Sequence, residues 1–240
     1  MATTRYLVVV YVVTAGLHED DLGCDEEETV LLAWVVVDIT NCKVVAVHTS
    51  VVKPRSADVN ENLLSEVARN QYGLTEELIK DGQPLENVLE ELDQFAKAKL
   101  SSETGRSFHV ITDGQLHLRQ VLHPEASNKG IQLPEYFNTF YDLRKEFRKF
   151  YRNNDIQTIE DAINYLSIEG DASADCAVQK VQNMAQIIIR LITDVCVQKL
   201  IRSPKLKDSS VVLFNEVKRA GSLVLTIQSK CLFLWTYLTE

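Results

Sequence analysis

Long apolar runs rich in β-branched residues occupy the beginning of the chain. They read YLVVVYVVTAG, TVLLAWVVVD and KVVAVHTSVVKP, and polar or turn-forming residues separate them. A continuous apolar run is typical of a strand that is covered on both faces of a sheet. The pattern predicts that the first run lies in the middle of the sheet, and that the next two form an antiparallel meander joined to it.

After residue 60 the period changes to the three- and four-residue spacing of helices. One apolar stripe predicts an amphipathic helix and contains Leu85, Val88, Leu89, Leu92, Phe95 and Ala96. A second stripe predicts a long helix over about residues 175 to 194 and contains Val178, Val181, Ala185, Ile188 and Ile192. Between them, SFHVIT and TFYDL predict two more strands, while RKEFRKFY and TIEDAINYL predict two more helices. We therefore expect an α/β fold with a mixed five-stranded sheet flanked by helices.

Composition and charge limit the possible partners. A length of 240 residues with 45% hydrophobic residues suits one α/β domain with a sizeable core. The formal net charge of −9 provides no general attraction to phosphate backbones, so a nucleic acid would need a local basic patch. Five cysteines without C-x-x-C spacing suit a reducing compartment, and we expect a nuclear protein that also occurs in the cytoplasm.

The segment YDLRKEFRKFY is a local patch with net positive charge and interleaved aromatic residues. Cations and aromatic rings together suit single-stranded RNA. The candidate RNA-binding residues are Arg119, His123, Arg144, Lys145, Arg148 and Lys149. We favour a competing interpretation, in which Phe147, Phe150 and Tyr151 pack inward and the cations of this helix are merely solvated.

Two other groups of residues raise the question of a metal site. The acidic run 19–28 lacks the fixed glycine and the ligand spacing of a calcium loop, so we expect a solvated connector. Three histidines lie close together in the sequence, namely His109, His117 and His123. The first lies on a predicted strand and the other two are six residues apart on a predicted helix, so they face different directions and are expected to be ordinary polar or capping residues.

The order of the elements resembles the ribonuclease-H-like fold of the DEDDh 3′-5′ exonucleases. VVVYVVTAGL resembles the first strand of that family, and KVVAVHTSVVKP resembles its third strand. The run TDGQLHLRQVLHPEASNKGIQLPEYFNTFYDLRKEF closely resembles the amino-terminal domain of the epithelial splicing regulatory proteins and their insect relative Fusilli. The resemblance implies an exonuclease-like domain over residues 5–196. Residues 197–240 are expected to be a divergent carboxyl-terminal tail, such as a truncated isoform would have.

The resemblance also implies where catalytic groups should lie. DEDDh enzymes hold two Mg²⁺ ions with four carboxylates and use a histidine as general base. The matching positions here are Tyr11, Val13, His117, Asp175 and Lys180. Asp175 matches the general-base histidine, and the other four match the metal ligands. None of these four carries a carboxylate, and the ammonium group of Lys180 opposes metal binding. The resemblance therefore implies a catalytically degenerate domain, with no catalytic residues, no bound metal and no cofactor.

The predicted function is that of a non-catalytic module in an RNA-binding regulator of alternative mRNA splicing, serving as a protein-interaction or auxiliary RNA-binding surface. Its expected partners are splicing-related proteins and RNA, which is bound weakly or through domains absent from this chain, but not membranes or DNA. One alternative is an active metal-dependent 3′-5′ RNA exonuclease whose carboxylates have moved, for instance to Asp113, Asp142 or Asp175. Another is a scaffold that contacts proteins only.

Overall fold

The computed structural model describes residues 4–59, 63–102, 105–168 and 176–202, and its centre is a mixed sheet of five strands. The strands are β1 (Tyr6–Thr14), β2 (Thr29–Asp38), β3 (Lys43–Val51), β6 (Phe108–Thr112) and β7 (Phe140–Asp142). They lie in the order β3-β2-β1-β6-β7. β1, β2 and β3 form an antiparallel meander, whereas β6 and β7 run parallel to β1. The predicted α/β fold with a mixed five-stranded sheet is confirmed.

The central strand β1 separates two hydrophobic cores. Because successive side chains of a strand point to opposite faces, Leu7 and Val9 enter one core while Val8 and Val10 enter the other. These four side chains are almost completely buried. The prediction that the first apolar run lies in the middle of the sheet is confirmed.

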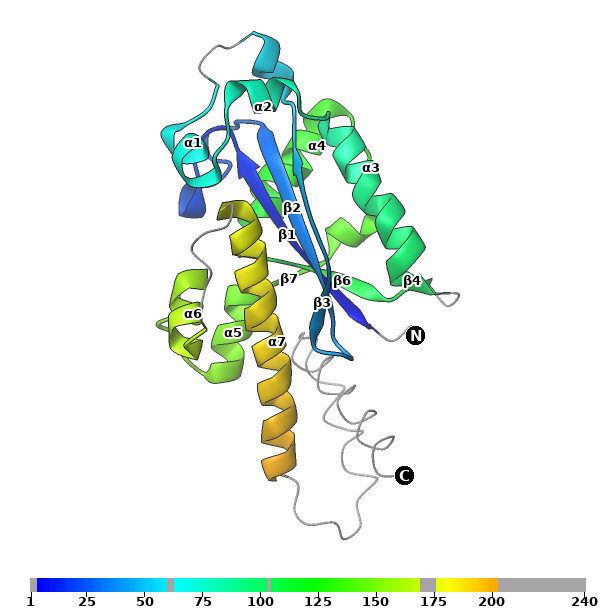
Figure 1. The fold of residues 1–240 in the computed structure, drawn as a ribbon, viewed down its shortest axis with the longest axis vertical. Coiled ribbons are helices and arrows are strands. Elements are labelled where there is room, and N and C mark those ends of the chain that lie inside the picture. The colour runs from blue at the N-terminus through cyan, green and yellow to red at the C-terminus, as the bar shows by residue number, and fades with distance from the viewer. Residues whose placement is uncertain (1–3, 60–62, 103–104, 169–175, 203–240) are drawn as a thin grey trace.

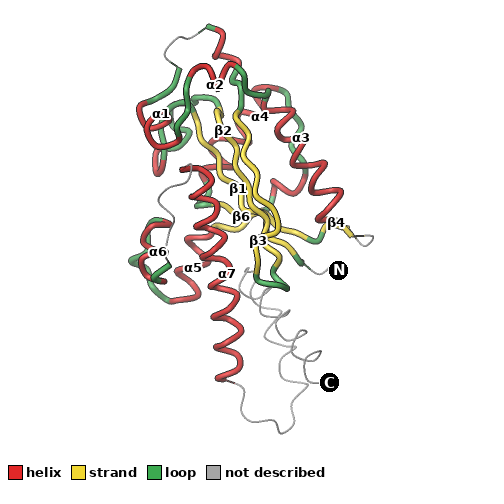
Figure 2. The backbone as a smooth tube through the Cα atoms, in the orientation of Figure 1, coloured by secondary structure: helices red, strands yellow, loops and turns green. Residues whose placement is uncertain are grey.

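Helices cover both faces of the sheet (Figures 1 and 2). The core on one face is shared with α1 (Glu66–Tyr72), α5 (Leu143–Tyr151), α6 (Ile159–Leu166) and α7 (Cys176–Arg202), and it also takes up Ile79 of α2 (Glu76–Lys80). The opposite core is shared with α3 (Leu85–Phe95) and with the helical segment that leads into α4 (His123–Lys129). Short elements complete the described chain: 3-10 turns at Glu19–Asp21, Arg55–Asp58 and Glu135–Asn138, π-helical turns at Ala96–Leu100 and His117–Leu122, and the hairpin of β4 (Ser101–Ser102) with β5 (Gly105–Arg106).

Helix α7 is longer than the sequence pattern predicts, since it runs from Cys176 to Arg202. Four members of the predicted stripe are fully buried, namely Val181, Ala185, Ile188 and Ile192. Val178 is only half-buried, and Ala177 and Met184 point into the core instead. The predicted boundary at residue 196 falls inside α7, and the tail beyond Arg202 lies outside the described residues. Among the helices of the described ranges, none is both long and apolar enough to cross a membrane.

Candidate functional site

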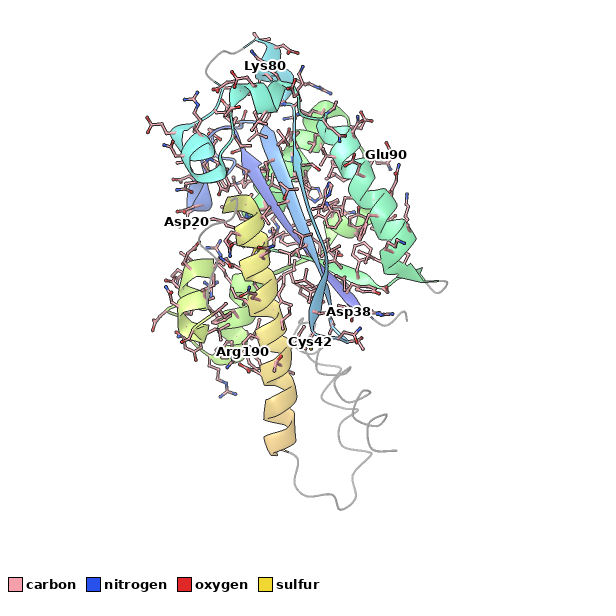
Figure 3. The ribbon with its side chains drawn as sticks, viewed as in Figure 1. Asp20, Asp38, Cys42, Lys80, Glu90 and Arg190 are labelled. Atoms are coloured by element: carbon pink, nitrogen blue, oxygen red, sulfur yellow. The ribbon has the colours of Figure 1, made fainter. Side chains whose placement is uncertain are left out.

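A small pocket lies where the carboxyl ends of β1, β6 and β7 meet. These three strands are parallel, so the residues that follow them gather at one edge of the sheet. The pocket has a volume of about 50 Å³, and its lining includes Tyr11, His18, Asp113, His117, Arg144, Glu160 and Lys180. In Figure 3, Asp20 marks this end of the sheet, whereas Asp38 and Cys42 mark the opposite end.

Aromatic rings form one wall of the pocket. The ring centroids of Tyr11 and His117 are 4.4 Å apart, and the hydroxyl groups of Tyr11 and Tyr72 are 2.9 Å apart. The ring of His18 lies 5.4 Å from that of Tyr72, and its Nε2 lies 3.3 Å from the Ser65 hydroxyl oxygen. These contacts fix the phenol of Tyr11 at the carboxyl end of the central strand.

His117 completes the hydrogen bonding of β1. The pairing of β1 with β6 ends at Val9, so Val12 lies beyond the paired part of that edge. His117 Nδ1 lies 3.2 Å from the Val12 nitrogen and 3.1 Å from the Val12 oxygen. The neutral imidazole accepts from the N–H in one tautomer and donates to the C=O in the other. Burial lowers the pKa of His117 to about 3, so this side chain is neutral at physiological pH.

An ion pair joins the turn after β6 to helix α5. Arg144 Nε lies 2.8 Å from Asp113 Oδ1, although the N–H is not aligned for a hydrogen bond. Arg144 Nη1 also donates to the Gln157 carbonyl oxygen at 2.8 Å. Gly114 has a φ of +73°, and a Cβ there would overlap Arg144 Nη2, so this glycine gives the guanidinium its place. Burial raises the pKa of Asp113 to about 6, an effect that outweighs the opposing influence of Arg144 and Lys180.

Lys180 brings a second cation to the pocket from the first turns of α7. Its Nζ lies 3.6 Å from Glu160 Oε1 and 5.9 Å from the centroid of the Tyr11 ring. The Lys180 side chain is only 17% exposed, whereas that of Glu160 is 60% exposed. Solvent therefore screens the charge of Glu160 more than that of Lys180.

The described residues of the pocket do not fit a pair of divalent metal ions. Mg²⁺ and Ca²⁺ prefer several oxygen ligands, mostly carboxylates. In the described ranges, no group of three or more His, Cys, Asp or Glu side chains is placed to hold a metal ion. Asp113 is paired with Arg144, and the Asp142 carboxylate caps α5 by accepting a hydrogen bond from the Lys145 N–H at 3.0 Å. Asp175, the third carboxylate considered for a relocated site, lies outside the described residues.

The positions singled out by the exonuclease resemblance separate into two groups. Tyr11, His117 and Lys180 line the pocket. Val13 is fully buried in the core shared with α7 and does not line the pocket. The β1 residues that line it are Tyr11 and Val12.

Only one of the six candidate RNA-binding residues, Arg144, lines the pocket. Arg148 donates to the Ile156 carbonyl oxygen at 3.1 Å, while Lys145 and Lys149 are exposed on α5. The other two lie on the segment 117–129, where Arg119 is 5.9 Å from the centroid of the Phe140 ring and His123 Nε2 is 3.1 Å from the Phe137 carbonyl oxygen. Their role in RNA binding stays a prediction.

The aromatic side chains of α5 pack inward, as the favoured interpretation of that helix predicts. Phe147 is fully buried, and Phe150 and Tyr151 are half-buried against the same core.

In the acidic run 19–28, the Asp25 carboxylate accepts a hydrogen bond from the Leu17 N–H at 2.6 Å and so holds the loop after β1 in place.

Sequence reasoning missed His18, Thr158 and Glu160 as pocket residues. His18 had an available signal, because it follows directly on the carboxyl end of the predicted central strand, where ligands of α/β sheets usually bind. Thr158 and Glu160 had no such signal, since they reach the pocket only through the packing of α6 against α5 and α7.

The search against protein-family models found no match. The chain is 23% identical over 192 residues to ERI1 exoribonuclease 2 of Xenopus laevis, a match that covers 74% of this chain and 27% of the relative. It is 22% identical over 134 residues to 3′-5′ exoribonuclease 1 of Homo sapiens, covering 55% of this chain and 38% of the relative. The match therefore spans well under half the length of either curated relative.

Solved structures show the same fold. A 3′-exonuclease in a structure describing 3′-end specific recognition of a histone mRNA stem-loop has a TM-score of 0.69 at 16% identity, covering 81% of this chain and 84% of the other. The nuclease domain of 3′hExo, a DEDDh family member bound to rAMP, has a TM-score of 0.68 at 17% identity, with coverages of 80% and 93%. Cell-death related nuclease 4 has a TM-score of 0.66 at 20% identity, with coverages of 80% and 65%.

The prediction that the chain is not an enzyme is contradicted by these comparisons. Both curated relatives are named as exoribonucleases, and the solved structures with the same fold include nucleases. The residues at Tyr11 and Val13 do not show a loss of catalysis, and the assignment to the epithelial splicing regulators is not shown. The chain has the α/β fold of the 3′-5′ exonucleases, and its homologues and structural neighbours are 3′-5′ exonucleases of the ribonuclease-H-like type.

Proposed function

We propose that this chain is a 3′-5′ exoribonuclease-type module that receives the 3′ end of an RNA strand at the pocket. The observation that carries the proposal is the position of Arg144 and Lys180 at the carboxyl edge of β1, β6 and β7. Glu19, Asp20 and Glu160 in the same lining are exposed to solvent, whereas the two cations are largely enclosed. Solvent screens the exposed carboxylates more than the enclosed cations, so the cations can attract a phosphate that enters the pocket, although the chain as a whole is acidic. The names of the relatives support RNA as the polymer and its 3′ end as the point of entry.

The residues of the pocket can bind and orient a strand end. Arg144 presents a planar guanidinium fixed by Gln157 and Gly114, which suits a phosphate group. His18, which is half-buried, places an aromatic ring beside the pocket, where a terminal base can stack. His117 remains uncharged and supports the floor of the pocket.

An RNA-trimming assay tests the proposal. A 5′-labelled single-stranded RNA is incubated with the purified chain in Mg²⁺, in Mn²⁺ and in EDTA, so that dependence on a metal ion is measured. Products shortened stepwise from the 3′ end are expected, and an Arg144→Gln variant purified in parallel should lose them. Equal trimming by both proteins would identify a contaminating nuclease, and the absence of trimming in all three conditions would contradict the proposal.

We also propose that the module works in the nucleus, in a regulator of alternative mRNA splicing with splicing-related proteins as partners. The support is the long run from Thr112 to Phe147, which resembles the amino-terminal domain of the epithelial splicing regulators. Cell fractionation of the tagged chain, and exon-inclusion measurements after its depletion, test this role. A chain confined to the cytoplasm, or exon inclusion that does not change, would count against it.

A further inference from the structure

The pocket combines two enclosed basic side chains with one enclosed carboxyl group, while the other carboxylates of its lining, Glu19, Asp20 and Glu160, are exposed and screened by solvent. Arg144 and Lys180 both line it, and both act electrostatically on Asp113, so all three groups lie close together. The side chains of Arg144 and Asp113 are each 20% exposed, and that of Lys180 is 17% exposed. Partial burial strengthens charge interactions relative to those on an open surface.

The size of the pocket restricts what can enter. Its volume of about 50 Å³ corresponds to roughly four water molecules, at about 10 to 15 Å³ for each. A phosphate group, with its phosphorus and four oxygens, matches that volume, but a whole nucleoside does not. A terminal phosphate can enter with one ester link trailing outside, whereas an internal phosphodiester must bring a sugar on each side.

We infer that the pocket binds the terminal 3′-phosphate group of an RNA strand directly between Arg144 and Lys180, with Asp113 as the internal anion that the phosphate replaces. The choice of the 3′ end rests on the proposed function, while the recognition of phosphate rests on the pocket alone. Oxygen atoms of the phosphate accept hydrogen bonds from the guanidinium and the ammonium group. No covalent bond forms or breaks in this step.

Asp113 sets the condition for binding, because an ionised carboxylate beside Arg144 repels an incoming phosphate. The other groups that act on it are Lys180 on α7, Glu160 on α6 and Asp142 at the start of α5. The pKa of Asp113 is about 6, so the group is mostly ionised at pH 7.5. A phosphate that requires neutral Asp113 then binds more weakly by up to about 30-fold at pH 7.5, since each pH unit above the pKa contributes a factor of about ten.

The test compares RNA ten-mers that differ only in their ends. Strands with a 3′-phosphate, a 3′-hydroxyl or a 5′-phosphate carry an internal label, and their dissociation constants are measured by fluorescence anisotropy in EDTA. The 3′-phosphorylated strand is expected to bind about tenfold or more tightly than the 3′-hydroxyl strand, as charge-assisted hydrogen bonds provide. Inorganic phosphate, used as the free probe, should compete with the 3′-phosphorylated strand and remove this advantage.

Three variants make the test specific. Arg144→Gln should abolish the preference for the 3′-phosphate, while Arg152→Gln, which removes an exposed arginine just after α5 and outside the pocket, should leave it unchanged. Asp113→Asn should bind the 3′-phosphate more tightly than the wild type at pH 7.5, and the two proteins should converge below about pH 6. The comparison at each pH isolates Asp113, because phosphate itself also titrates near pH 6.

The outcomes separate this inference from the proposed function. Equal affinity for 3′-phosphate and 3′-hydroxyl strands, in both the wild type and Asp113→Asn, would overturn the inference even if 3′-hydroxyl RNA is trimmed. A preference for the 5′-phosphate would overturn it as well. A preference for the 3′-phosphate without any trimming would support the inference and contradict the proposed function.

Discussion

Asp113 is subject to opposing effects, since burial raises its pKa whereas Arg144 and Lys180 lower it, and burial prevails. The carboxyl group therefore holds its proton more tightly in the folded chain than in the unfolded chain. A raised pKa of this kind contributes stability that is fully present below about pH 4 and is lost as the pH rises through about 6.

The first prediction follows from the raised pKa of Asp113. Asp113→Asn should be more stable than the wild type by up to about 3 kcal/mol at pH 7.5, with the difference shrinking steadily between about pH 6 and pH 4. Urea unfolding of both proteins at half-unit pH steps measures the difference. A gap that widens toward low pH would show that the pKa of Asp113 is lowered rather than raised.

The second prediction concerns the protonation of His117. Because burial lowers its pKa to about 3, its ring should show no titration between pH 5 and 8. Proton NMR of the imidazole carbon-bound hydrogens, recorded at pH steps across this range, measures this. A midpoint for His117 near 6 to 7 would mean that its ring is not buried against Val12.

At the level of single residues, the sequence predicted positions better than roles. The resemblance led to Tyr11, His117 and Lys180, and all three line the pocket. It did not reveal that the His117 ring bonds to the backbone of β1, because nothing in a linear pattern shows that β6 stops pairing at Val9. Arg144 was expected on the outer surface of its helix, either solvated or in contact with RNA, and only the three-dimensional turn at Gly114 brings it into the pocket.

The turn between β6 and the following helix is the element that shapes the pocket. Gly114 has a positive φ there, and the space that a Cβ would occupy is filled by Arg144. Two other glycines, Gly73 and Gly130, also have positive φ but face open space. A side chain would be strained at all three glycines, but it would overlap a neighbouring side chain only at Gly114.

The third prediction uses this difference. Gly73→Ala should cost about 1 kcal/mol through backbone strain alone, whereas Gly114→Ala should add to that strain the displacement of the Arg144 guanidinium and should therefore also weaken phosphate binding. Chemical denaturation measures the first effect, and the anisotropy assay measures the second. Equal losses of stability with unchanged binding would mean that Arg144 moves aside freely.

The fourth prediction concerns the outer face of α5. Lys145 and Lys149 are exposed, whereas Arg144 and Arg148 donate to carbonyl oxygens of residues 156–157. If both lysines contact RNA phosphates, the double variant Lys145→Gln with Lys149→Gln should reduce the slope of log affinity against log salt by about 1.4.

A matched pair provides the control for that experiment. Lys97 and Lys99 lie on the helical continuation of α3 over the other face of the sheet, and replacing both by glutamine removes the same charge. Their loss should leave the salt slope unchanged. If both double variants reduced the salt slope equally, RNA affinity would depend on the net charge of the chain and not on a contact made by α5.

Periodicity predicted the elements themselves more fully than their ends. The stripe of α3 and the apolar run of β1 appear as expected, because burial against a sheet imposes a repeat that a sequence must display. The extension of α7 to Arg202 did not follow from the stripe, since Val195 is the last residue of this helix that the described core buries. Beyond the core, helix length depends on local propensity and on contacts that the repeat does not report.

At the scale of the whole molecule, α7 joins the sheet to the small helices. It packs against β1, β2 and β3 as well as α1, α5 and α6. Figure 1 shows it lying along one face of the sheet, with its first turns toward the carboxyl end of β1, and its residue Lys180 lines the pocket. The second half of this helix therefore contributes to the core that holds the pocket together.

The fifth prediction tests that contribution. A chain ending at Arg202 keeps every described core residue and should unfold cooperatively, whereas a chain ending at Asn183 should not fold. The side chains lost in the shorter chain are Met184, Ala185, Ile187, Ile188, Leu191, Ile192 and Val195. The larger ones contribute about 1.5 to 3 kcal/mol each, which together rivals a total stability of about 5 to 15 kcal/mol. Thermal unfolding followed by circular dichroism distinguishes the two, and a cooperative transition in the shorter chain would contradict this role of α7.

The hydrogen bond between His117 and Val12 joins the lining of the pocket to β1, the central strand of the sheet. The His117 side chain bonds to Val12 where β6 no longer pairs with β1. If the helical segment that carries His117 moved away, the Val12 peptide groups would lose this hydrogen-bond partner. One wall of the pocket is therefore preset before any ligand arrives. The pocket would then select among RNA ends by how well each end fits its existing shape, and closure of the protein around the RNA would contribute little.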